Sequence, residues 1–146
     1  MTETDLKFGI PDIALPMAGG GFVNPSDFAG HQLIIVFCPT EPSAAARELS
    51  EYGAHASELC DNDAWIVGIC DDEAESSVAA KESCFSVAAD QERAAWEAFR
   101  SLSGHRRELQ RDKGAVFLFG RGGSLQRAWA GAGHASEVTR ELKQRM

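Results

Sequence analysis

The sequence predicts an α/β fold in which helices flank a central mixed β-sheet, and three observations lead to this prediction. Two apolar runs, at residues 32–38 and 64–70, are separated by a stretch with helical periodicity. A third apolar run at 115–119 is followed by a glycine-rich turn and a further strand-like segment at 125–130. A last segment, 134–145, has apolar residues four apart, as in a helix that covers a sheet. A βαβ unit gives parallel strands and a short hairpin gives antiparallel ones, so the sheet should be mixed.

The first 38 residues contain a turn-rich entry and the first long strand. Prolines and glycines interrupt short apolar pieces across residues 1–30, which predicts a hairpin-like entry. The run from Gln32 to Cys38 is continuously apolar after its first residue and ends before Pro39. A strand without polar alternation is typical of one covered on both faces, so this strand should lie inside the sheet.

The next segments alternate between helix and strand. A helix should begin near Pro42, with Thr40 or Ser43 as its N-cap. Further on, residues 71–82 read as a surface helix, 85–90 as a short strand or extended piece and 92–102 as a short helix. The apolar residues of the first helix recur at steps of four and three and so share one face: Ala45, Leu49, Tyr52, Ala56 and Leu59. A locally basic stretch near the third strand reads as a solvated helix face: Arg100, Arg106, Arg107, Arg111 and Lys113.

Length and composition limit the class of protein. A chain of 146 residues, 44% of them hydrophobic, predicts one domain over residues 1–146. The net charge of −8 disfavours nucleic acid as a partner. The N-terminal residues look like no export signal and no apolar run is long enough to span a membrane, so we expect a cytoplasmic protein. The four cysteines form no C-x-x-C pair and should be reduced thiols, with Cys60, Cys70 and Cys84 in structural roles.

Several segments together resemble a known family. They are Pro11–Pro16, Pro25–Gly30, the strand ending Phe37-Cys38-Pro39, and Phe117–Gly120. Together these segments resemble the peroxiredoxins of the alkyl hydroperoxide reductase and thiol-specific antioxidant family, over roughly residues 8–145. The resemblance implies a thioredoxin-like fold and a thiol-dependent peroxidase ancestry.

The family's reaction depends on a loop of the form Pro-x-x-x-Thr-x-x-Cys and on an arginine from a neighbouring strand. Counted from Pro39, the hydroxyl position falls on Ser43 and the nucleophile position on Ala46. The arginine position falls on Gly114, with Lys113 as the only nearby cation in the sequence. A methyl group cannot attack a peroxide oxygen, so the resemblance implies a vestigial peroxidase pocket, and whether the protein is an enzyme stays open.

Two functions follow from this interpretation. The first is a non-catalytic redoxin module that binds a protein or a small molecule, and a homodimer is compatible with it. The second is a peroxide reductase that uses a relocated thiol such as Cys38, the cysteine nearest the vestigial pocket. No cofactor is expected. No metal site is expected either, because Asp61-x-Asp63 begins like a calcium loop but lacks the later glycine and glutamate.

Overall fold

A computed structural model describes residues 6–7, 9–17, 20–71, 84–90, 92–103 and 108–144 of the chain. Its centre is a five-stranded sheet in the order β7-β6-β5-β8-β9. The strands span Gln32–Phe37 (β5), Ala64–Cys70 (β6), Phe85–Ala89 (β7), Ala115–Phe119 (β8) and Leu125–Ala130 (β9). The predicted mixed sheet is therefore confirmed, and the apolar run that begins at residue 32 forms its middle strand.

The pairing of the strands follows the order of the elements. β5 pairs with β6 in parallel, with Phe37 opposite Ile69, and β6 pairs with β7 in parallel. β5 pairs with β8 and β8 with β9 in antiparallel fashion. The carboxyl ends of β5 and β6 therefore lie at the same end of the sheet. Cys38 directly follows β5 and Cys70 ends β6, so the two cysteines are neighbours there.

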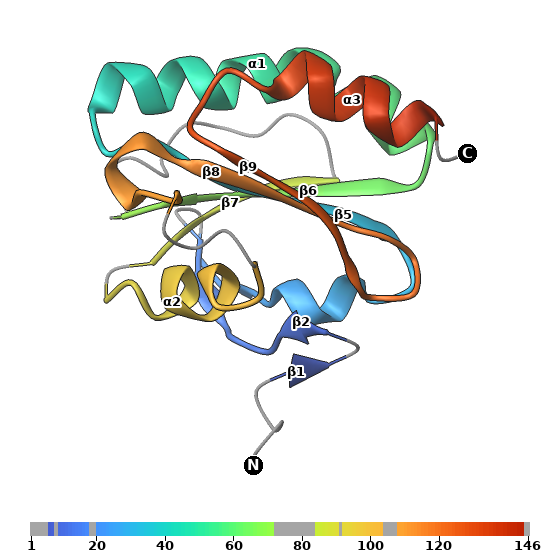
Figure 1. Cartoon of the computed structure of the whole chain (residues 1–146), viewed down its shortest axis with the longest axis horizontal. Helices are drawn as coiled ribbons and strands as arrows, with labels where there is room; N and C mark the ends of the chain where they lie inside the picture. The colour runs from blue at the N-terminus through green and yellow to red at the C-terminus, as the bar shows by residue number, and fades with distance from the viewer. Residues whose placement is uncertain are drawn as a thin grey trace.

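Helices cover both faces of the sheet (Figure 1). Helix α1 (Pro42–Asp61) and helix α3 (Ala135–Gln144) lie on one face, and the shorter helix α2 (Ala94–Arg100) lies on the other. Successive side chains of β5 point to opposite faces of the sheet. Ile34 packs on the face covered by α1 and α3, whereas Ile35 packs on the face covered by α2. The predicted apolar face of α1 is buried in full (Ala45, Leu49, Tyr52, Ala56 and Leu59).

The turn-rich N-terminal region forms two small hairpins and a 3₁₀ turn. β1 (Leu6–Lys7) pairs with β2 (Ile10–Pro11), and β3 (Leu15–Pro16) pairs with β4 (Phe22–Val23). The 3₁₀ turn η1 (Pro25–Phe28) follows. Met17, directly after β3, makes a bridge to Ala88 of the outer strand β7. The hairpin-like entry predicted from the prolines and glycines is thus present, and it covers one edge of the sheet.

Two sequence-based predictions about the middle of the chain have different outcomes. The surface helix expected at 71–82 falls almost entirely outside the described residues. The basic stretch is not the solvated helix face that we predicted, because residues Arg111–Lys113 form the 3₁₀ turn η3 and Arg111 is buried, with 5% of its surface exposed. Arg106 and Arg107 lie outside the described residues. Within the described ranges, no helix has the length and apolar character needed to cross a membrane.

Candidate functional site

The loop after β5 lies against the residues that precede β8. Pro39 is buried, and the Thr40 N–H donates to the carbonyl oxygen of Asp112 at 3.1 Å. A Cβ at Gly114 would stand 3.2 Å from the backbone nitrogen of Pro39. Of the residues predicted for the pocket, Pro39 and Gly114 therefore come together at the carboxyl end of β5, next to the candidate thiol Cys38.

The other two predicted pocket residues, Ser43 and Ala46, are exposed on the first turns of α1. Neither Thr40 nor Ser43 caps this helix, contrary to our prediction; Glu41 does. Its carboxylate accepts hydrogen bonds from the N–H groups of Ser43 (3.2 Å) and Ala44 (2.7 Å), and from the Ser43 hydroxyl at 2.7 Å. The Ser43 hydroxyl, followed by these N–H groups, lowers the pKa of Glu41. A carboxylate thus occupies the positive end of α1, where a peroxidase would hold its thiolate.

The cation near the pocket is Arg111, not Lys113 as the sequence spacing predicted. Gly114 has a φ of 86°, and a Cβ there would lie 2.6 Å from the Phe37 carbonyl oxygen, so the backbone itself disfavours an arginine at this position. The buried Arg111 guanidinium instead donates to the carbonyl oxygen of Cys38 and forms an ion pair with Asp71 at 3.0 Å. It also lies over the Phe37 ring, 5.5 Å from its centroid. These partners, distant in the sequence, explain why the basic stretch is not wholly solvated.

Cys38 has a second thiol as its neighbour. Cys38 and Cys70 are both free and fully buried. A hydrogen bond with the Cys70 side chain, together with burial, raises the pKa of Cys38 well above its usual range, and the nearby Arg111 charge only partly opposes this. Cys38 is therefore mainly a neutral thiol at neutral pH, which is the less nucleophilic form. The sequence analysis named no such neighbour, although the predicted βαβ unit, whose parallel strands lead to both cysteines, offered a signal for it.

Two buried polar side chains lie on the core side of α1. Glu48 is 2% exposed; its Oε1 accepts a hydrogen bond from the Gly133 N–H at 3.0 Å, and its Oε2 has no partner among the described residues. Burial raises the pKa of Glu48 and also that of Tyr52, whose hydroxyl has no described partner. The charge of Glu48 further raises the pKa of Cys38. A carboxylate near this thiol disfavours its ionisation, which is the opposite of what a peroxidatic cysteine needs.

The other two cysteines form a disulfide, which corrects the prediction of four reduced thiols. Cys60 lies in the last turn of α1 and Cys84 immediately precedes β7. Helix and strand bring their Cα atoms to 5.7 Å, and the two sulfurs are bonded. The two cysteines are 24 residues apart in the sequence, so no local motif indicated that they pair.

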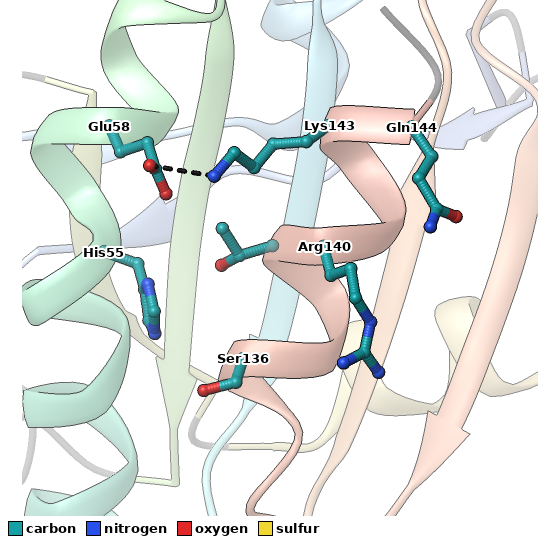
Figure 2. Close-up of a pocket in the computed structure, with 7 residues that line it drawn as sticks. His55, Glu58, Ser136, Arg140, Lys143 and Gln144 are labelled. Atoms are coloured by element: carbon teal, nitrogen blue, oxygen red, sulfur yellow. Dashed lines mark hydrogen bonds and ion pairs between the residues drawn. The ribbon is translucent and has the colours of Figure 1, made fainter.

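A groove lies between the C-terminal half of α1 and α3 (Figure 2). Its volume is about 370 Å³, and an ion pair between Lys143 Nζ and Glu58 Oε2 at 3.0 Å crosses it. The remaining lining residues are His55, Ser136, Thr139, Arg140 and Gln144. Because the predicted pocket stands at the N-terminal end of α1, this groove takes no part in it.

In the part of the chain that the structure describes, no three His, Cys, Asp or Glu side chains are grouped so that they could hold a metal ion. The residues His55, Glu58, Cys60, Asp61 and Asp63, which are close in the sequence, form no such group either. Cys60 is already bonded to Cys84.

Comparisons with known proteins agree with this architecture. A model described as the AhpC/TSA family matches residues 9–127. No curated protein sequence matches the chain significantly. Peroxiredoxin Q of Xanthomonas campestris is similar, with a TM-score of 0.72 and 25% identity over 92% of each chain.

Two further solved structures share the fold. A mutant PrxQ of Xylella fastidiosa has a TM-score of 0.73 and 22% identity, over 99% of this chain and 93% of that one. An exposed lipoprotein thioredoxin of Streptococcus pneumoniae has a TM-score of 0.67 and 16% identity, over 91% of this chain and 98% of that one. The fold is thioredoxin-like, as the sequence predicted.

Proposed function

The chain belongs to the AhpC/TSA family, and we propose that it is a redoxin module which has lost the family's peroxidase chemistry and acts by binding a partner. One observation carries the proposal: the position that corresponds to the attacking thiol is Ala46. The Glu41 carboxylate at the start of α1 supports it, because an anion already occupies the place that would favour a thiolate. The exposed Ser43 and Ala46 leave the former pocket open as a binding surface.

A second candidate function is a peroxide reductase that uses Cys38. The observation in its favour is the buried Arg111, whose guanidinium donates to the Cys38 carbonyl and whose charge lowers the pKa of that thiol. Against it stand the complete burial of Cys38 and the larger influences that raise its pKa. The balance of these effects favours the non-catalytic module.

Peroxide consumption with a thiol reductant tests the two candidates. We expect wild-type protein to react with hydrogen peroxide no faster, as a second-order rate constant, than a free thiol at the same pH, and Cys38→Ser to remove at most this slow reaction. Ala46→Cys serves as the matched control, since it restores a thiol at the nucleophile position. A wild-type rate far above that of a free thiol would refute the proposal, and its loss in Cys38→Ser would assign the reaction to the relocated thiol.

Three sequence-based expectations stay predictions: one domain over residues 1–146, a cytoplasmic location, and a homodimer or another partner. The Cys60–Cys84 disulfide bears on the second, because disulfides persist mainly in oxidising compartments. Size-exclusion chromatography and co-purification from the native host address the third.

A further inference from the structure

The two buried thiols at the carboxyl ends of β5 and β6 have the placement of a bondable pair. Phe37 is opposite Ile69 in the parallel register, and the Cys38 N–H continues the ladder to the Ile69 carbonyl oxygen at 3.0 Å. Cys38 is therefore opposite Cys70. Side chains at matched positions of neighbouring strands point to the same face, and both cysteines belong to the core layer under α1.

The spacing of neighbouring strands also suits a disulfide. Adjacent strands lie about 4.8 Å apart, and disulfide-bonded residues usually have Cα atoms roughly 4.4–6.8 Å apart. Both side chains lie in the same buried cluster, and the Cys70 side chain raises the pKa of Cys38, in keeping with two adjacent thiols. Bond formation thus requires only a local rearrangement of these side chains.

We propose that Cys38 and Cys70 form a second dithiol–disulfide couple, which hydroperoxides oxidise slowly and stoichiometrically. In the first step the Cys38 sulfur attacks the terminal peroxide oxygen, the O–O bond breaks, and the products are a cysteine sulfenic acid and an alcohol, or water from hydrogen peroxide. In the second step the Cys70 sulfur attacks the sulfenic sulfur and water leaves with the thiol proton. Overall, two thiols lose two electrons and two protons, and the peroxide is reduced to alcohol and water.

The surroundings of the pair explain why this reaction should be slow. Both thiols are fully buried, so a peroxide reaches them only when the end of the sheet opens locally. Arg111 stands at this end, bonded to the Cys38 carbonyl and paired with Asp71, and supplies the positive charge that a thiolate needs. Glu48 opposes ionisation. The Cys38–Cys70 bond should therefore form under prolonged exposure to oxidant and not in rapid catalytic turnover.

This inference does not depend on the proposed function. A module without catalytic peroxidase activity can still form the Cys38–Cys70 bond once per molecule. Rapid peroxide consumption would refute the proposed function but not the inference about the bond. If the bond does not form, the inference is wrong and the proposed function still stands.

Peptide mapping without reduction tests the inference on the full chain. Wild-type protein is treated with excess hydrogen peroxide, unfolded, alkylated and digested with trypsin. Cys38 falls on peptide 8–47, Cys60 and Cys70 on peptide 48–81, and Cys84 on peptide 82–93. Without peroxide we expect 48–81 joined to 82–93, with 8–47 alkylated and separate. With peroxide we expect all three in one species, with the loss of two further hydrogen atoms.

Variants and a second digestion identify the bond. Cleavage at Asp61 and Asp63 separates Cys60 from Cys70, so it distinguishes the expected bond from an exchange with the existing disulfide. Cys38→Ser and Cys70→Ser should each abolish the peroxide-dependent link, whereas Cys60→Ala/Cys84→Ala, the matched control, should keep it. If wild-type Cys38 and Cys70 both stay alkylatable after peroxide, or Cys38 is oxidised to sulfinic acid without joining Cys70, the inference is wrong.

Discussion

Removal of the Cys60–Cys84 disulfide should lower the free energy of unfolding by about 3.5 kcal/mol. The bond joins residues 24 apart in sequence, so it closes a loop of that length in the unfolded chain. The chain-entropy relation gives an entropy loss of roughly 12 cal/mol/K for such a loop, which is about 3.5 kcal/mol at room temperature. The folded state is affected less, because the end of α1 and the start of β7 are also held by core packing.

Urea denaturation of wild type and of Cys60→Ala/Cys84→Ala, each with and without reductant, measures this contribution. Alanine is the better replacement, since Cys84 is buried and a serine hydroxyl would add a polar group there. Reductant should destabilise the wild type and leave the double variant unchanged. A loss below about 1 kcal/mol, or an equal response of both proteins to reductant, would refute the loop-closure reasoning.

Three further predictions test the packing and the electrostatics around α1 and the end of β5. Gly68→Ala should cost about 1–3 kcal/mol of unfolding free energy, because its Cβ would stand 2.7 Å from Leu49 Cδ2. Leu49→Ala alone should cost about 2–5 kcal/mol, and urea denaturation should show that the double variant loses less than the sum. Gly114→Arg should lower the thermal midpoint, because of its φ of 86° and the 2.6 Å approach to a backbone oxygen, whereas Gly122→Arg, with open space around its Cα, should not. Glu41→Gln should be less stable than wild type at neutral pH. Because the folded pKa of Glu41 is lowered, this difference is full above the unfolded pKa of about 4.3 and should vanish as pH falls through the folded value; equal losses at all pH values would contradict it.

Much of the fold could be predicted because its signals are local. The apolar run in β5 and the steps of four and three in α1 are written in consecutive residues, and the structure buries those positions as expected. The parallel pairing of β5 and β6 follows from the helix between them. Such patterns depend on periodicity alone and need no knowledge of distant partners.

The site was less predictable because its main interactions are tertiary. Arg111 is buried through Asp71 and the Cys38 carbonyl, neither of which is near it in the sequence. Glu41 was missed for another reason: glutamate is not among the usual N-cap residues, so Thr40 and Ser43 were the better guesses from preference alone. The register of Cys38 and Cys70, in contrast, could have been inferred from the βαβ unit.

The bridge between Met17 and Ala88 has a consequence for self-association. An outer strand presents unpaired N–H and C=O groups that can add a strand from another molecule. At one outer strand, β7, Met17 after β3 pairs with Ala88. At the other outer strand, β9, the charged Arg127 forms ion pairs with Glu137 and Glu141. With like-charged copies also repelling one another at a net charge of −8, both borders of the sheet resist edge-to-edge polymerisation.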